Sequence, residues 1–180
     1  GDKTYTLGKY ESIRIRASIA ELAANGGAPM GFYTRVKDPE ARKVITSYYG
    51  FLHQHNDLYH DNTSHAEALL IFPRGAVHAG DLAPRDRFKQ LGRKLLDEHV
   101  LFDILPDDMA TAAVRKKYGL VVDPGDAKVS AASLQKILPA RRSRFDAPPT
   151  VRVSASRPAL LDELTVHFVN YNRTERGEGG

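Results

Sequence analysis

Residues 66–72 read AEALLIF, and this short, almost continuously apolar run decides the fold. Runs of this kind are typical of parallel strands that are buried on both faces of a sheet. Two more follow, at 102–105 and 120–122. Between the first two, apolar residues recur at helical spacing over 83–99. The alternation of strands and helices predicts a right-handed parallel α/β sheet.

Residues that suit helix N-caps precede the helices of this region. We expect Asp81 to cap the helix over 83–99, Asp107 and Asp108 to cap a short helix that ends near Gly119, and Ser130 to cap a helix that runs to Leu138. An Asp directly before a helix is far more often a cap than a catalytic group, so these acids are assigned to capping. Residues 74–80, which hold two glycines, are expected to form a loop.

The first sixty residues have a helix–strand–helix pattern. Residues 11–25 are apolar over much of a helix circumference, and the Asn-Gly-Gly sequence at 25–27 ends that helix. Residues 28–33 form another apolar run, which predicts a second buried strand. Asp-Pro-Glu at 38–40 then opens the next helix, with Asp as its cap. The polar residues 56–65 are expected to be a tether to the following α/β region.

The C-terminal part changes from helical to alternating patterns. Apolar and polar residues alternate over 150–155 and again over 164–171, which predicts two antiparallel strands. We expect a β-hairpin over 149–172. The polar, glycine-containing tail at 173–180 is expected to be disordered.

Composition excludes several kinds of chemistry. The chain has no Cys, so it has no disulfide, no zinc–thiolate site and no cysteine nucleophile. No apolar run reaches the roughly 18 residues that a membrane-spanning helix needs. The net charge of +4 comes from scattered basic residues, with one dense cluster at 141–144. Solvated helix faces explain this scatter better than a nucleic-acid-binding surface does.

Six segments, in the same order along the chain, resemble β-galactosidase-like glycoside hydrolases that carry a trimerisation domain. They are IAELAANGGAP at 19–29, HQHNDLY at 53–59, AEALLIF at 66–72, HVLFDILPDD at 99–108 with LVVDP at 120–124, and LTVHFVNY at 164–171. The resemblance implies that residues 1–60 are the C-terminal end of a (β/α)8 barrel, a TIM barrel. It implies that residues 65–145 are an incomplete flavodoxin-like domain of the glutamine-amidotransferase-like type. The hairpin at 149–172 would belong to a closing β domain.

The same resemblance implies a role in carbohydrate metabolism through hydrolysis of O-glycosyl bonds. Family members take their two catalytic carboxylates from mid-barrel strands, which would precede residue 1, so we name no catalytic pair and expect this chain alone to be inactive. At the barrel rim the expected substrate contacts are Lys9, Tyr10, Phe32, Tyr33 and Arg35. Barrel packing is the competing explanation for the two aromatic residues. Without Cys, amidotransferase chemistry is excluded.

Two alternative functions remain open. In the first, the chain is a non-catalytic α/β module for oligomerisation or ligand binding. In the second, it is a flavodoxin-type protein that holds a nucleotide or phosphate at 74–81, with Arg74 and His78 as possible contacts. The glycine spacing in that loop matches neither dinucleotide nor P-loop motifs, which makes the phosphate signal weak. His53 and His55 would point about 200° apart on a helix, so we expect no metal site and one buried imidazole, His55.

No cofactor is expected. The expected partners are a carbohydrate, bound through the barrel of the parent protein, and further copies of the chain, with neither nucleic acid nor membrane. A soluble, cytoplasmic location is favoured over secretion. An open barrel remnant exposes strand edges, so the isolated chain is expected to associate.

Overall fold

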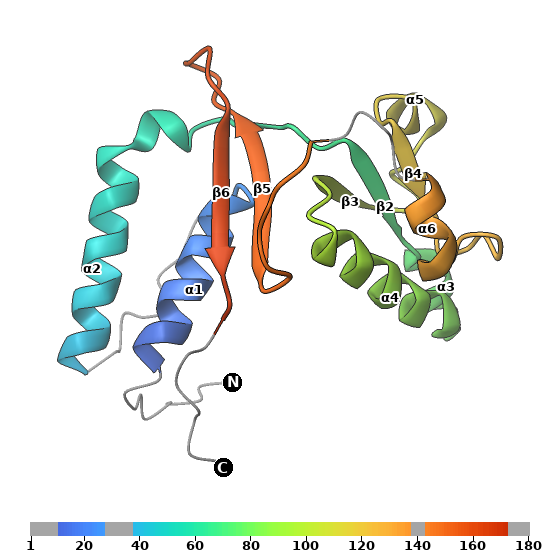
Figure 1. Cartoon of the computed structure of the whole chain (residues 1–180), viewed down its shortest axis with the longest axis horizontal. Helices are drawn as coiled ribbons and strands as arrows, with labels where there is room; N and C mark the ends of the chain where they lie inside the picture. The colour runs from blue at the N-terminus through green and yellow to red at the C-terminus, as the bar shows by residue number, and fades with distance from the viewer. Residues whose placement is uncertain (1–10, 28–37, 138–142, 173–180) are drawn as a thin grey trace.

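A computed structural model of the chain describes residues 11–27, 38–137 and 143–172 (Figure 1). In those ranges the helices are α1 (Glu11–Ala24), α2 (Pro39–Gln54), α3 (Arg74–His78), α4 (Ala83–Asp97), α5 (Ala112–Arg115) and α6 (Ala131–Ile137), with a 3-10 turn η1 (Asn56–Leu58). The strands are β1 (Thr63–Ser64), β2 (Ala68–Phe72), β3 (Phe102–Pro106), β4 (Leu120–Val122), β5 (Val151–Arg157) and β6 (Thr165–Asn170). The described chain is therefore a mixed α/β structure with two small sheets, one of them parallel.

The parallel sheet has the strand order β3-β2-β4, with the AEALLIF strand at its centre. Ala68 is in register with Phe102 on one side and with Leu120 on the other. The first four residues of β2 are buried, which is the pattern predicted for a strand covered on both faces. The sequence-based prediction of three parallel strands separated by helices is confirmed.

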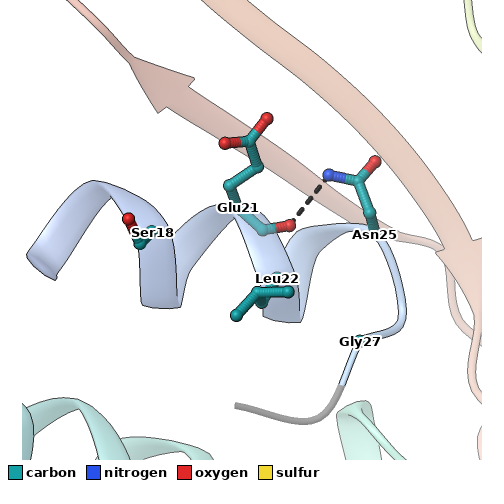
Figure 2. Close-up of a pocket in the computed structure, with 5 residues that line it drawn as sticks. All are labelled: Ser18, Glu21, Leu22, Asn25 and Gly27. Carbon is teal, nitrogen blue, oxygen red and sulfur yellow. Dashed lines mark hydrogen bonds between the residues drawn. The ribbon is translucent and has the colours of Figure 1, made fainter. Parts of the chain in front are cut away.

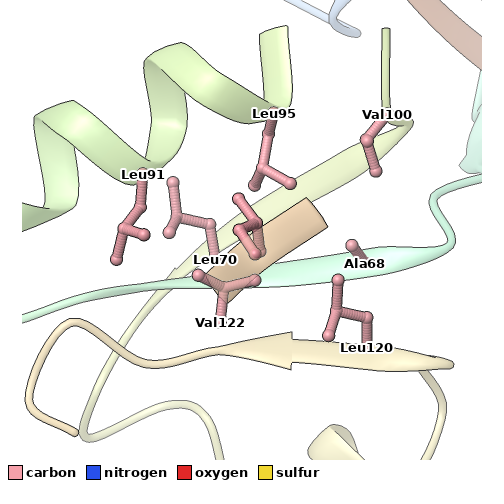
Figure 3. Packing of buried hydrophobic residues seen from close by; sticks show 8 residues of the cluster. Ala68, Leu70, Leu91, Leu95, Val100, Leu120 and Val122 are labelled. Atoms are coloured by element: carbon pink, nitrogen blue, oxygen red, sulfur yellow. The ribbon is translucent and has the colours of Figure 1, made fainter. Parts of the chain in front are cut away.

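Helices cover both faces of this sheet. On one face Leu70 and Val122 pack with Leu91 and Leu95 of α4 and with Leu134 of α6 (Figure 3). On the other face the core consists of Leu69, Ile71 and Ala110, with Leu105, Val114, Tyr118 and Val121 packed against it. Because residues of β2 alternate between these two clusters, one strand anchors both halves of the core.

The second sheet is antiparallel, with the order β1-β5-β6. The hairpin predicted over 149–172 is confirmed, with Val153 in register with Phe168. The prediction that 56–65 is only a tether was wrong, because Thr63 and Ser64 pair with Arg157 and Ser156 as a short third strand. Both residues of β1 are exposed, so backbone pairing rather than side-chain burial holds this strand, and no hydrophobic pattern indicated it.

Helices α1 and α2 pack together through Ile15, Ile19 and Ala41. The predicted start of α2 and the predicted end of α1 are both confirmed. Asp38 caps α2 by accepting a hydrogen bond from the N–H of Ala41, at 2.9 Å. Beyond α1, Gly26 has φ +74°, and the N–H groups of Gly26 and Gly27 donate to carbonyls of the last turn, the bonding pattern of a Schellman motif.

Three local predictions were wrong. Residues 74–80 are not all loop, since Arg74–His78 forms the short helix α3. Asp107 and Asp108 do not cap a helix after β3, because Thr111 caps α5. The Asp107 carboxylate instead accepts a hydrogen bond from the N–H of Gly75 in α3, at 3.1 Å. Asp81 lies one residue before the N-cap position of α4, but it still accepts from the N–H of Ala83.

The buried histidine was also misplaced. His55 follows the last residue of α2 and is only half-buried. His99, between α4 and β3, is 7% exposed. The expected barrel strand at 28–33 and the tail at 173–180 lie outside the described residues.

Candidate functional site

A cleft of about 1120 Å³ lies between the two sheets. Strand β3 and helix α4 form one wall, and strand β5 with the C-terminal end of α1 forms the other. Figure 1 shows β3 on the side of the parallel sheet that is nearest to β5. The cleft therefore lies between the parallel sheet with its helices on one side and the antiparallel sheet with α1 on the other.

The residues that line the cleft are consecutive along both strands. They run from 101 to 105 on the β3 side and from 152 to 156 on β5. Side chains of a strand alternate between its two faces, so a wall made by one face would contain every second residue. Consecutive lining residues indicate that each strand presents its edge to the cleft.

One carboxylate in the cleft joins the two sheets. Asp103 of β3 accepts a hydrogen bond from the hydroxyl of Ser64 in β1, at 2.7 Å, and another from the hydroxyl of Tyr118, at 2.8 Å. Burial, followed by the hydrogen bond to Asp103 and the charge of Asp103, raises the pKa of Tyr118 to about 12. Tyr118 is therefore a neutral donor at neutral pH, and Asp103 is held by two hydroxyl groups from different parts of the chain.

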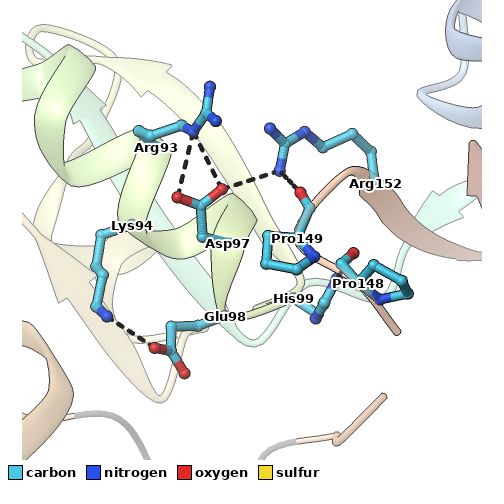
Figure 4. A network of polar contacts seen from close by, with 8 residues as sticks. All are labelled: Arg93, Lys94, Asp97, Glu98, His99, Pro148, Pro149 and Arg152. Atoms are coloured by element: carbon cyan, nitrogen blue, oxygen red, sulfur yellow. Dashed lines mark hydrogen bonds and ion pairs between the residues drawn. The ribbon is translucent and has the colours of Figure 1, made fainter. Parts of the chain in front are cut away.

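A cluster of charged and backbone groups closes one end of the cleft (Figure 4). Asp97 of α4 accepts from Arg93 at 3.1 Å and from Arg152 of β5 at 3.3 Å. Arg152 also donates to the carbonyl of Pro149, at 2.9 Å. Two guanidinium groups, from α4 and from β5, thus share the carboxylate of Asp97.

The segment that leads into β5 is also fixed by partly buried contacts of His99 and Ser143. A ring nitrogen of His99 lies 3.1 Å from the carbonyl oxygen of Pro148. The N–H and the hydroxyl of Ser143 both donate to Oε1 of Glu67, at 2.7 and 2.8 Å. These contacts attach the segment that leads into β5 to residues that flank the strands of the parallel sheet.

A carboxylate of α1 and a tyrosine that follows β6 also line the cleft. Glu21 of α1 accepts a hydrogen bond from Tyr171, which follows β6. Burial, then this hydrogen bond and the charge of Glu21, raise the pKa of Tyr171. The lining of the cleft thus contains two arginines, Arg93 and Arg152, and two carboxylates, Glu21 and Asp103.

A smaller pocket of about 370 Å³ lies on the same helix, at its C-terminal end (Figure 2). Ser18, Glu21, Leu22, Asn25 and Gly27 line it. The amide of Asn25 donates to the backbone carbonyl of Glu21 and is thereby used for helix capping. The larger cleft, with its charged groups and open strand edges, is the stronger candidate site.

The residues expected at a barrel rim, Lys9, Tyr10, Phe32, Tyr33 and Arg35, lie outside the described residues. Arg74 and His78 both lie on α3, directly after β2. Arg74 forms an ion pair with Asp108, and the hydrogen bond from Arg74 is the main cause that lowers the pKa of Asp108. Together with the bond from Gly75 to Asp107, this fills the start of α3 with two carboxylates. An additional anion there would meet negative charge, which disfavours the phosphate hypothesis.

Sequence reasoning did not identify the cleft residues Asp103 and Arg152. A signal was present, because each is a charged residue inside an otherwise apolar or alternating strand, in FDIL and VRV. Among the described residues no group of three or more histidines and carboxylates could hold a metal ion. None of the described helices is long and apolar enough to span a bilayer.

Searches of protein-family models, of curated proteins and of solved structures found no significant match to this chain. Its function must therefore be inferred from its own residues and their geometry.

Proposed function

We propose that this chain is a binding and assembly segment of a glycoside-hydrolase-like, carbohydrate-active protein, in which the hydrolytic carboxylates lie outside the chain. One observation carries the proposal. The order β3-β2-β4 puts the first strand of the parallel sheet between the second and the third. That is the order in which flavodoxin-type sheets begin, and it is the domain type that the sequence resemblance implies. In this proposal α1 and α2 are the closing helices of the parent barrel.

The contacts of the acids in the cleft support a non-catalytic role. Glycoside hydrolysis ordinarily needs one carboxyl group to protonate the leaving oxygen and a second to attack or to activate water. Asp97 and Asp103 each already bind two groups, one of which comes from the antiparallel sheet: Arg152 for Asp97 and Ser64 for Asp103. Glu21 accepts from Tyr171. Each of these side chains therefore has a structural task that explains its position.

The reading frame upstream of residue 1 tests the proposal. A (β/α)8 barrel requires about 250 residues of alternating strand and helix patterns. We expect most of such a pattern to precede this chain, with two carboxylates at the ends of mid-barrel strands. An upstream sequence without that pattern would remove the glycoside-hydrolase assignment.

Activity measurements on the chain itself give a second test. We expect no hydrolysis of 4-nitrophenyl galactosides above the buffer rate. We also expect no increase in melting temperature with nucleotides or inorganic phosphate, because carboxylates occupy the start of α3. Turnover by the purified chain would contradict the non-catalytic assignment, and a shift with phosphate alone would favour the flavodoxin-type alternative.

A second candidate function is an oligomerisation module without any link to carbohydrate. The observation that favours it is an exposed apolar group on the hairpin, where Phe168 is 58% exposed and packs edge-on against Phe145. Strand β6 is also the outer strand of its sheet within the described residues. Sedimentation over a range of protein concentrations would reveal such association, and substitution of Phe168 by Ser should reduce it.

A further inference from the structure

The sequence holds a single Asn-Gly pair, Asn25-Gly26, directly after the last residue of α1. In such a pair the backbone nitrogen of the glycine can attack the carbonyl carbon of the asparagine side chain, because glycine has no Cβ to hinder the approach. The other four asparagines, at 56, 62, 170 and 172, precede residues that carry side chains. Asn25 therefore faces the least hindered backbone nucleophile of any asparagine in the chain.

The turn that contains this pair is open to solvent. Asn25 and Gly26 are both exposed, and a methyl group added at Gly26 would have nothing within 4 Å. Figure 2 shows the side chain of Asn25 at the end of the helix, with its amide directed back toward the carbonyl of Glu21. No side chain packs over Gly26, so water reaches both the asparagine and its neighbour.

The helix cap controls when the two reacting groups can meet. In the closed cap the Asn25 amide donates to the carbonyl of Glu21 at 2.8 Å, and the N–H of Gly26 donates to the carbonyl of Ala23 at 3.2 Å. Both hydrogen bonds must break before the nitrogen of Gly26 can approach Cγ of Asn25. They belong to an exposed helix end, where local opening costs little free energy. The rate of reaction should therefore follow the opening of this turn.

We propose that Asn25 is a site of spontaneous deamidation, which converts it to a mixture of aspartate and isoaspartate. The nitrogen of Gly26 loses its proton and bonds to Cγ of Asn25. The bond from Cγ to Nδ2 breaks, and the amide nitrogen leaves as ammonia with the proton from Gly26. Water then hydrolyses the cyclic imide at either of its carbonyls, which yields the two products. The only co-reactant is water, and no electron transfer occurs.

Neither product can restore the cap. A carboxylate has no N–H to donate, so the hydrogen bond to the carbonyl of Glu21 is lost. Its negative charge lies at the C-terminal end of α1, where the helix dipole is also negative. Isoaspartate adds a carbon atom to the main chain, which displaces the N–H groups of Gly26 and Gly27 from the carbonyls they bind on α1. Deamidation should therefore weaken the end of α1.

The same reaction changes the wall of the cleft. Ala24, Asn25 and Gly26 all line it, and the hydroxyl of Ser154 in β5 donates to the carbonyl of Ala24 at 2.6 Å. Deamidation adds a carboxylate to this wall, next to the point where α1 is attached to β5. The inference needs no carbohydrate activity, so it stands or fails independently of the proposed function.

The test follows the full chain over time at mildly alkaline pH, which favours loss of the amide proton. Peptide mapping by mass spectrometry locates each deamidated asparagine, and enzymatic methylation of isoaspartate detects that product. We expect Asn25 to react first, with both products present, while the other asparagines remain intact. An unreacted Asn25 after Asn170 or Asn172 has converted would overturn the proposal, and so would aspartate without isoaspartate, which indicates direct hydrolysis.

Two variants separate the nucleophile from the cap. Gly26→Ala puts a Cβ beside the attacking nitrogen, and in urea, where the cap is absent, it should slow the reaction roughly tenfold. Ser154→Ala leaves the Asn-Gly pair unchanged but removes the hydrogen bond to Ala24, so it should accelerate deamidation of the folded chain. In urea Ser154→Ala should react at the rate of the unchanged chain. Melting curves establish that the Ser154→Ala chain is folded.

Each comparison has an outcome that contradicts the proposal. Equal rates for Gly26→Ala and the unchanged chain in urea would exclude attack by the nitrogen of Gly26. That measurement does not depend on whether the variant folds. Equal rates for folded Ser154→Ala and the folded, unchanged chain would exclude control by the opening of the cap, and so would equal rates for the unchanged chain with and without urea.

Discussion

The hydroxyl of Ser64 and the carboxylate of Asp103, 2.7 Å apart, form a direct hydrogen bond between the antiparallel and the parallel sheet. Ser64 belongs to the two-residue strand β1, and Asp103 belongs to the edge strand β3. Because Tyr118 donates to the second oxygen of Asp103, the same carboxylate also connects β3 to the chain that precedes β4. One side chain thus links three segments at the rim of the cleft.

Replacing Asp103 by Asn should lower the pKa of Tyr118 from about 12 toward 10. Burial is the largest cause of the raised value, so part of the shift should remain, while the contributions from the charge and the hydrogen bond of Asp103 should disappear. NMR titration of carbon-13-labelled tyrosine rings measures this directly. Ser64→Ala is the matched control, because it removes the other hydrogen bond and leaves the Tyr118 contact in place.

The raised pKa of Tyr118 has a consequence for stability. In the unfolded chain the group ionises near pH 10, whereas in the folded chain it stays protonated up to about pH 12. Its contribution is therefore fully present below pH 10 and is lost as the pH rises toward 12. Urea unfolding at pH 9 and pH 11 should show a smaller loss of stability in Asp103→Asn than in the unchanged protein. An equal loss in both would contradict this assignment.

Hydrogen exchange should distinguish alternate amides along β3. We expect the amides of Asp103 and Leu105 to exchange slowly because they bond to β2. The amides of Phe102 and Ile104 should exchange much faster because they point into the cleft. Residue-resolved NMR exchange on the free protein gives the comparison. Uniform protection of all four amides would show that something already pairs with this edge.

Apolar runs predicted the parallel sheet because β2 and most of β4 are buried and β3 is largely half-buried, and burial leaves a pattern in the sequence. It failed for β1, whose residues are exposed and held through their backbone. It also failed for α3, because the acids that bind to its start come from after β3, more than thirty residues away. The cleft could not be predicted, since it depends on how two sheets are placed. Only charged residues inside strands, such as Arg152, indicated it.

Two glycines of the helical region should respond in opposite directions to alanine. Gly26 has φ +74° and an open surrounding, so Gly26→Ala should cost about 1 kcal/mol through backbone strain rather than a clash. Gly50 lies inside α2, and nothing lies within 4 Å of an added methyl group, so Gly50→Ala should stabilise by about 0.5–1 kcal/mol. Chemical denaturation of both variants provides the measurement. A stabilising Gly26→Ala would contradict the C-cap assignment.

Truncation of a side chain in the central strand should be far more damaging than truncation on the surface. Leu70 is 1% exposed and packs between α4 and β4, so Leu70→Ala should cost about 2–5 kcal/mol. Leu160 is 72% exposed, and Leu160→Ala should change stability by less than about 0.5 kcal/mol. Unfolding curves in urea compare the two. A small effect at Leu70 would contradict its place in the core of the parallel sheet.

His167 should make the fold sensitive to mild acid. Its ring nitrogen Nε2 lies 3.2 Å from the hydroxyl of Tyr59, and Nδ1 is buried without a partner among the described groups. Burial lowers the pKa of His167 below its ordinary value of about 6.5. As the pH falls below about 6.5, the unfolded chain therefore takes up a proton on His167 before the folded chain does. Stability should therefore be highest above pH 6.5 and fall as the pH drops toward the folded-state pKa.

Two variants identify the cause of this pH dependence. His167→Phe keeps an aromatic ring but cannot titrate, so the difference in unfolding free energy between pH 7.5 and pH 5.5 should become smaller. Tyr59→Phe removes the hydroxyl but keeps the ring whose centroid lies 5.5 Å from that of His167. Because burial rather than the Tyr59 contact lowers the pKa, Tyr59→Phe should retain the pH dependence. If both variants reduce the pH dependence of the unfolding free energy equally, the hydrogen bond with Tyr59 and not desolvation controls the ionisation of His167.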